Sequence, residues 1–209
     1  MAIFTDNFTG TSGDLVSART GWNKYGSGST DVFQVNASNQ AKIAGTFPDD
    51  GAMYGQDPGA ADHFVEATLF ANAVKSKCSA ILSVRVVDRN DRVSLEYDDG
   101  SSVWRIRNGG ASIATSNAFG APGGEKYRFQ CESAVLKTYK NDSLVWTYDA
   151  VGDLSGGGLT NTKVGALMLS STGSPVDTVI DDWRSGLVSD LAGGAVSSGF
   201  LLLTMDDEH

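Results

Sequence analysis

Two carboxylates near the middle of the chain have the spacing for acid–base chemistry. Glu96 and Asp98 are two residues apart, so a strand would place them on one face. Glycoside hydrolysis uses such a pair, with the two carboxyl groups roughly 5–10 Å apart. However, Asp98 stands where the chain turns, and no base, orienting group and pocket can be assembled around the two acids. The residues therefore favour a solvated strand end over a catalytic pair.

The same region carries side chains that could bind a sugar. Sugar sites combine aromatic faces with polar groups that hold hydroxyls, and Tyr97, Arg105 and Arg107 are the candidates for a glycan-binding surface. Trp104 alternates with the two arginines along its strand, so the ring and the cations point to opposite faces. We therefore predict that Trp104 belongs to the core and that the arginines lie on a solvated face.

Composition argues against several other kinds of site. The 209 residues include 16 Lys and Arg against 25 Asp and Glu, a net charge of −9, which disfavours nucleic acid as a partner. His63 and the terminal His209 are the only histidines, which argues against a His-based zinc site or a Ser-His-Asp triad. Cys78 and Cys131 fall among apolar, alternating residues, so free core thiols are favoured over a disulfide.

Alternating side chains predict the strands that would position these residues. Three runs between residues 78 and 108, separated by turns at 88–91 and 98–100, predict a central antiparallel meander, and residues 125–149 predict a second one. Further strands are expected at 31–35, 40–44, 62–71, 112–115, 163–170 and 178–184, and a loop at 46–61. Without any long helical periodicity, this pattern predicts an all-β fold, an antiparallel two-sheet β-sandwich of jelly-roll type.

The C-terminal residues differ in composition from the rest. Residues 1–186 are the predicted domain, and residues 187–209 are a tail that is glycine-rich and apolar before it becomes acidic. An apolar tail left loose would expose a large patch, so we expect it to pack on the domain or on a neighbouring subunit. The residues predicted to contact a partner are Ile3, Phe4, Leu187, Leu191, Phe200, Leu201, Leu202 and Leu203.

Neither end of the chain shows a membrane or export signal. The opening MAIFTDNFTG has no basic region followed by an apolar one, so no secretory leader is predicted. The apolar run at 200–203 is far shorter than the roughly 20 residues that cross a bilayer.

The order of these landmarks resembles the concanavalin A-like lectin/glucanase superfamily, most closely its laminin-G-like jelly-roll modules. The similarity covers about residues 3–187 and is carried by the strand pair in KTYKNDSLVW (137–146) and by the closing Asp181-Asp182-Trp183. It implies a concanavalin A-like sandwich. Hydrolases of this superfamily carry three alternating acids on one strand, whereas Gly100 occupies the third position here, which puts catalysis in doubt.

The resemblance also implies that a structural calcium ion could be bound. Laminin-G-like modules often carry such an ion, which takes carboxylates and carbonyl oxygens as ligands. The candidate ligands are Asp6, Asp177 and either Asp181 or Asp182, because first and last strands often lie side by side. Asp181 and Asp182 point to opposite faces, so only one of them could serve, and Asp182 is preferred.

These observations together predict a protein that acts by surface contact and is not an enzyme. The leading hypothesis is a virion surface protein that decorates a phage capsid or tail, contacts other virion subunits or copies of itself, and leaves the host cytoplasm by lysis. The alternative is an extracellular, lectin-like adhesion module that binds polysaccharide. A glycoside hydrolase is less favoured, and no cofactor beyond calcium, no nucleic acid and no membrane is expected.

Overall fold

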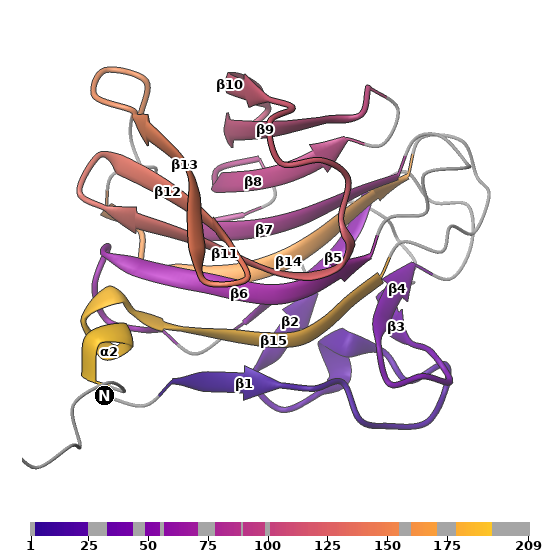
Figure 1. Cartoon of the computed structure of the whole chain (residues 1–209). Coiled ribbons are helices and arrows are strands. Elements are labelled where there is room, and N and C mark those ends of the chain that lie inside the picture. The colour runs from indigo at the N-terminus through magenta and orange to yellow at the C-terminus, as the bar shows by residue number, and fades with distance from the viewer. Residues whose placement is uncertain are drawn as a thin grey trace, which may run out of the picture.

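The computed structural model describes residues 3–24, 33–43, 49–54, 57–70, 78–88, 90–98, 101–154, 160–170 and 179–193. These residues form two antiparallel sheets stacked as a sandwich (Figure 1). The eight-stranded sheet contains, in spatial order, β13 (Ser143–Asp149), β12 (Val135–Lys140), β11 (Gly123–Glu132), β6 (His63–Phe70), β15 (Val179–Leu187), β4 (Ala41–Ile43) and β3 (Phe33–Val35), with β1 (Phe4–Asp6) also paired to β15.

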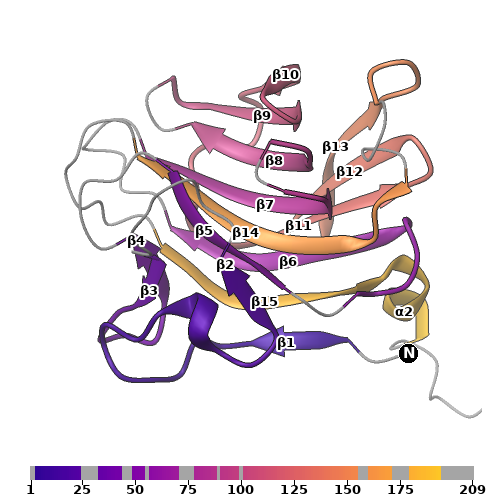
Figure 2. The ribbon, with the colours of Figure 1, turned by 180° about the vertical axis from the view of Figure 1, so that it is seen from behind.

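The second layer is a seven-stranded sheet, seen nearest the viewer in Figure 2. It contains, in spatial order, β10 (Ala111–Ser116), β9 (Val103–Asn108), β8 (Val93–Asp98), β7 (Cys78–Val86), β14 (Lys163–Ser170), β5 (Asp49–Tyr54) and β2 (Trp22–Lys24). The all-β, two-sheet antiparallel sandwich predicted from alternation is therefore confirmed.

The core fills the space between the two sheets. Alternate residues of β7, β8 and β9 point inward from one side, and those of β6 and β11 from the other. The ring of Trp104 lies 4.6 Å from the ring of Tyr127 and 5.2 Å from that of Tyr97, measured between centroids. Trp104 is fully buried, as the alternation predicted. Its indole nitrogen donates to the carbonyl oxygen of Gly120 at 2.6 Å.

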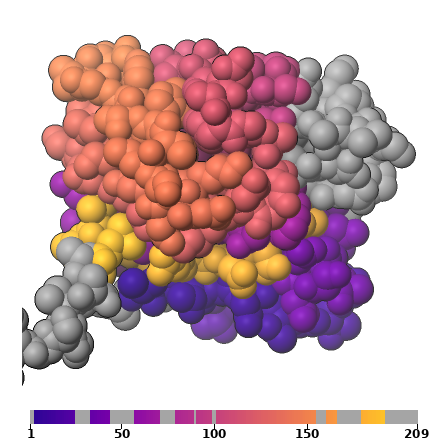
Figure 3. Space-filling model, viewed as in Figure 1, coloured from indigo at the N-terminus to yellow at the C-terminus, as the bar shows by residue number. Residues whose placement is uncertain are grey.

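Both predicted meanders are present as β7–β8–β9 and β11–β12–β13. Figure 3 shows the β11–β13 meander covering the upper part of the face above β15 and β1. The hairpin between β12 and β13 turns at Asn141 and Asp142, which both have positive φ angles of 49° and 64°. Asn and Asp tolerate this left-handed region better than most residues, which explains how the turn forms without glycine.

The expected loop at residues 46–61 is wrong in its middle part. Strand β5 occupies residues 49–54 and pairs with both β14 and β2. The sequence DDGAMY has acids and glycine where a strand usually has alternating apolar residues, so its strand character comes from pairing with two neighbours. Tertiary pairing here overrides the local preference.

The predicted boundary between domain and tail falls inside a strand. Leu187 is the last residue of β15, and a short helix, α2 (Val188–Gly193), follows it directly. The helix contacts β6, β11 and β15, and the backbone nitrogen of Val188 donates to the carbonyl oxygen of Asp62 at 3.2 Å. The described start of the tail therefore packs on the domain. None of the described helices is long and apolar enough to cross a membrane.

Candidate functional site

The outer face of the seven-stranded sheet carries a group of polar side chains that we call the Glu96 cluster. Its members are Ser79 on β7, Glu96 and Asp98 on β8, and Arg105 and Arg107 on β9. Val93, Leu95 and Tyr97 point into the core, so the intervening residues of β8 must point outward. Register then places Glu96 directly opposite Arg105.

Glu96 lies at the centre of the cluster and has little contact with solvent. Its residue exposure is 2%, whereas the side chains of Arg105 and Arg107 are each 22% exposed. Arg107 forms an ion pair with Glu96 through Nε, and Ser79 donates its hydroxyl to Glu96 Oε1 at 3.1 Å. Glu96 therefore fixes the arginines, and the arginines form the accessible surface.

Asp98 continues this network toward the end of β8. It forms an ion pair with Arg105, and the hydroxyl of Ser101 donates to Asp98 Oδ2 at 2.5 Å. Arg105 Nη2 donates to the same hydroxyl oxygen at 2.9 Å. Each of these polar groups is thus oriented by a neighbour.

The predicted glycan-binding set is only partly brought together. Arg105 and Arg107 share the outer face, but Tyr97 is buried in the core with its ring beside Trp104, so it cannot form one surface with them. The alternation of β8 already required this separation, because Tyr97 has the same parity as Leu95.

The acid pair also differs from a hydrolytic site. Glu96 and Asp98 do share a face, as expected, but both carboxylates are ion-paired with arginines. Glu96 is 2% exposed, so the solvated strand end expected from the sequence is wrong for this residue. Gly100 lies outside the described residues, and its identity alone removes a third carboxylate from this strand.

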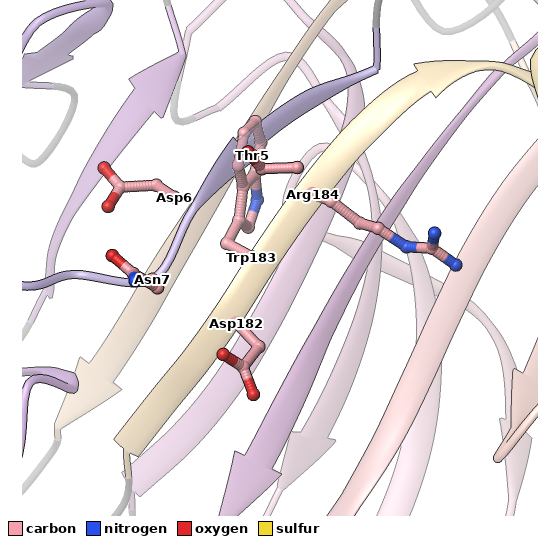
Figure 4. Close-up of a pocket in the computed structure, with 6 residues that line it drawn as sticks. All are labelled: Thr5, Asp6, Asn7, Asp182, Trp183 and Arg184. Atoms are coloured by element: carbon pink, nitrogen blue, oxygen red, sulfur yellow. The ribbon is translucent and has the colours of Figure 1, made fainter.

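A pocket of about 380 Å³ lies on the eight-stranded sheet beside β1 and β15 (Figure 4). Its lining residues are Thr5, Asp6, Asn7, Asp182, Trp183 and Arg184. It forms where β15 is irregular: the register with β6 shifts between Asp181 and Arg184, and Asp182 has a φ of 48°. Such a bulge turns side chains away from regular alternation, which opens the sheet here.

Asp6 is committed to a structural network within this pocket. Its carboxylate accepts hydrogen bonds from Arg19 Nε at 2.9 Å, Arg19 Nη2 at 2.8 Å, Trp22 Nε1 at 2.8 Å and the backbone nitrogen of Phe8 at 2.7 Å. These donors occupy both carboxylate oxygens. Asp6 therefore anchors the N-terminal segment, and it is poorly placed to bind a cation as well.

The other predicted calcium ligands do not assemble around Asp6. Asp182 lines the same pocket, but Figure 4 shows that its carboxylate points away from that of Asp6. Asp181 accepts a hydrogen bond from the backbone nitrogen of Asp182 at 2.8 Å, and burial raises the pKa of its carboxyl group. Asp177 lies outside the described residues. Among the residues described, no group of three or more His, Cys, Asp or Glu side chains could hold a metal ion.

A second buried carboxylate, missed by sequence reasoning, lies on the outer face of the eight-stranded sheet. Glu66 on β6 is 2% exposed, and Arg184 Nε donates to its Oε1 at 2.5 Å. Arg128 Nη1 lies 3.5 Å from Oε2, and Lys126 Nζ lies 3.8 Å from Oε1. The hydrogen bond from Lys126 lowers the pKa of nearby Asp142, which also accepts from Arg128. The only sequence signal was an acid between the apolar residues of β6.

A third polar group joins the two sheets at the end near α2. His63 is fully buried, and its Nε2 accepts a hydrogen bond from the backbone nitrogen of Arg85 at 3.1 Å. Its Nδ1 therefore carries the proton and donates to the carbonyl oxygen of Ala60 at 2.9 Å. Desolvation lowers the pKa of His63 to about 4.

Cys131 is a buried free thiol, as predicted, and burial raises its pKa to about 11.

The residues predicted to contact a partner are only partly described. Ile3 is 37% exposed at the start of β1, and Phe4 is partly buried against the core. Leu187 and Leu191 are partly buried at the end of β15 and in α2. Phe200, Leu201, Leu202 and Leu203 lie outside the described residues, so the proposed contact surface of the tail stays a prediction.

The comparisons with known proteins identify the fold. No protein-family model matches the sequence, and no curated protein matches it. Among solved structures, a glycosyl hydrolase family protein from Mycobacterium fortuitum is similar with a TM-score of 0.62 and 14% identity, over 87% of this chain and 98% of that one.

Two further solved structures extend this similarity to binding and hydrolytic proteins. The carbohydrate-binding module CBM66 from Bacillus subtilis has a TM-score of 0.55 and 15% identity, over 82% of this chain and 99% of that one. A beta-1,3-glucanase from Mycobacterium marinum has a TM-score of 0.53 and 13% identity, over 87% and 97% of the two chains. The chain thus has the β-sandwich fold that carbohydrate-binding modules and glycosyl hydrolases also have.

Proposed function

We propose that this chain is a carbohydrate-binding module and that the Glu96 cluster is its binding surface. The observation that carries the proposal is the arrangement of Arg105, Arg107 and Asp98 on one sheet face, held from below by the buried Glu96. Guanidinium groups donate to sugar hydroxyl oxygens, and a carboxylate accepts from sugar hydroxyl groups. Groups that are fixed before binding lose little entropy when a ligand arrives.

The comparisons support this function more than the virion hypothesis. The similar structures are named as a carbohydrate-binding module, a glycosyl hydrolase family protein and a beta-1,3-glucanase, and all three names refer to carbohydrates. Nothing in the comparisons supports a phage capsid or tail role. At these low identities the likeness shows the fold alone, so the function rests on the chemistry of the site. The placement on a virion surface, the laminin-G-like relationship and the extracellular alternative stay predictions.

Binding is favoured over hydrolysis by the state of the two acids. A hydrolase needs one carboxyl group that donates a proton and another that attacks or activates water, both within reach of the bond to be broken. Here Glu96 is covered and Asp98 is ion-paired with Arg105. We therefore propose that the acids orient the arginines and that the chain releases no sugar product.

The test is a binding measurement on immobilised glycans, followed by titration calorimetry with laminarin, a neutral β-1,3-glucan. Arg107→Ala should weaken binding about tenfold or more, because a charge-assisted hydrogen bond contributes roughly 1.5–3 kcal/mol. Lys137→Ala is the matched control, since Lys137 is a partly exposed cation on the other sheet whose ion-pair partner among the described residues is Glu132. Equal affinity of wild type and Arg107→Ala would overturn the proposed site, and reducing sugar released from laminarin would overturn the non-enzymatic assignment.

A further inference from the structure

The pocket beside β1 and β15 belongs to a different sheet from the Glu96 cluster. Thr5, Asp182 and Arg184 come from strands of the eight-stranded sheet, whereas the Glu96 cluster is built on β7, β8 and β9. Its volume of about 380 Å³ falls within the range of roughly 300–1,000 Å³ that is typical of small-molecule sites. Nothing in the proposed function uses it.

The polar side chains that line this pocket differ in how many hydrogen bonds they already make within the protein. Asp6 is fully engaged by Arg19, Trp22 and Phe8. Asn7 uses its side-chain oxygen to accept from the backbone and hydroxyl of Thr9. Asp182 is exposed, and its backbone nitrogen, not its carboxylate, makes the hydrogen bond to Asp181 that is seen among the described residues. Asp182 is thus an acceptor that a ligand can reach.

Arg184 supplies a donor whose position is fixed. Its Nε is held by Glu66, and its guanidinium carbon lies 5.8 Å from the centre of the Phe64 ring. The hydrogen bond to Glu66 raises the pKa of Arg184, so the group stays charged at all ordinary pH values. Figure 4 shows Arg184 and Asp182 leaving β15 in different directions, with Thr5 on the neighbouring strand beside Trp183.

Charge accounting decides which ligand suits this lining. Asp6 is matched by Arg19, whereas Arg184 shares Glu66 with Arg128 and Lys126, which also pair with Asp142. These three cations face two carboxylates, and the exposed carboxylate of Asp182 offsets the positive charge that remains. A lining with balanced charge favours neither an anion nor a cation, whereas a neutral polyhydroxylated ring can donate to Asp182 and accept from Arg184, Asn7 and Thr5.

We infer that this pocket is a second carbohydrate subsite, which takes one neutral sugar residue on the sheet opposite the Glu96 cluster. The inference rests on the proposed function for its ligand class, but on separate residues for its site. A single copy of the chain then offers two separate binding places for neutral polysaccharide, one on each sheet.

The experiment is a two-dimensional amide NMR titration of the full chain with laminaritriose, a neutral β-1,3-linked trisaccharide. We expect two groups of shifts with separate dissociation constants, one around Asn7 and Asp182 and one around Arg105 and Arg107. The double variant Thr5→Val/Asp182→Asn should weaken the first group about tenfold and leave the second unchanged. Asn keeps the left-handed backbone at position 182, and Val suits a strand, so this variant should fold.

Controls separate the failure of this inference from that of the proposed function. Thr147→Val, an exposed threonine of β13, should change neither group of shifts. Shifts confined to Arg105 and Arg107 would overturn the second subsite and leave the proposed function in place. Shifts confined to Asn7 and Asp182 would overturn the Glu96 cluster as a binding surface and leave the second subsite in place. The absence of both groups of shifts would overturn both sites. Tighter binding of a β-linked glucuronic acid trisaccharide at Asp182 would overturn the neutral class.

Discussion

Arg85 on the seven-stranded sheet donates from Nη2 to the carbonyl oxygen of Ser133, 2.6 Å away, in the turn between β11 and β12 of the other sheet. The same side chain donates from Nε to the carbonyl oxygen of Ala61 at 3.0 Å, just before β6. Arg85 is fully buried, so this guanidinium joins the two layers inside the protein. Buried charges of this kind persist only when their hydrogen bonds are made.

Arg85→Met should therefore destabilise the fold. The substitution keeps most of the volume but removes the guanidinium donor from the carbonyl oxygen of Ser133 and leaves that of Ala61 with only the thiol of Cys131. A hydrogen bond from a charged donor contributes roughly 1.5–3 kcal/mol, so we expect a loss of about 2–4 kcal/mol in the free energy of unfolding, measured with urea. Lys137→Met, at a partly exposed ion pair, should cost less than about 1 kcal/mol. Equal stability of the two variants would contradict the role assigned to Arg85.

Stability should fall on acidification because of His63. Burial lowers its pKa in the folded protein to about 4, while the unfolded chain has the ordinary value of 6.5. Between these values the unfolded state binds more protons, so the contribution is complete above pH 6.5 and is lost as the pH falls toward 4. A shift of this size corresponds to about 3 kcal/mol.

The check is a series of urea unfolding curves between pH 7 and pH 4 for wild type and His63→Gln. The amide of Gln can still accept from the backbone nitrogen of Arg85 but does not titrate. The variant should therefore show a flatter pH profile over this window. Parallel profiles for the two proteins would assign the acid sensitivity to other groups.

Glu66→Gln should destabilise the protein because three cations would lose their common partner. Breaking a fully buried pair costs about 3–5 kcal/mol, and we expect about 2 kcal/mol here because Arg184 and Lys126 are each about one-third exposed. Glu132→Gln is the matched control, since Glu132 pairs with Lys137 at a side-chain exposure of 35% and should change stability by less than about 1 kcal/mol. Thermal melts of both variants in low salt provide the measurement.

Calcium should not raise the thermal stability of the protein by binding to Asp6. Both oxygens of Asp6 accept from Arg19, and one also accepts from Trp22, so a cation would have to break these bonds first. We expect the melting temperature of chelator-treated protein to stay constant when calcium chloride is added. A rise that is removed by Asp182→Asn or Asp177→Asn would instead restore the calcium hypothesis at those residues.

Much of the fold follows from side-chain alternation. The stretch from Cys78 to Val86 predicts a strand because its inward residues are small or aliphatic in strict alternation, and β7 is observed there. Strand β5 was missed because nothing within DDGAMY marks it, and its pairing with β14 and β2 depends on distant residues. Helix α2 was missed because six residues are too few to establish a period of 3.6.

The candidate sites were harder to predict than the strands. The shared face of Arg105 and Arg107 followed from local alternation, and so did the burial of Trp104. The partners of Glu66 come from β11 and β15, and their separations of 62 and 118 residues leave no local signal. The pocket beside Asp182 depends on a bulge, and a one-residue irregularity in register cannot be seen in a period-two pattern.

The position of β15 has a consequence for how the chain is made. This last strand of the described chain pairs with β6, β4 and β1, so it lies inside the eight-stranded sheet and not at its edge. In the finished sheet, β1 and β4 are joined to β6 only through β15, and β3 is joined through β4. These strands therefore cannot take their places beside β6 in the sheet until β15 has been synthesised. The nascent chain can form the β7–β8–β9 and β11–β12–β13 meanders early, because their contacts are local. Final closure of the sandwich must wait until residue 187 has emerged.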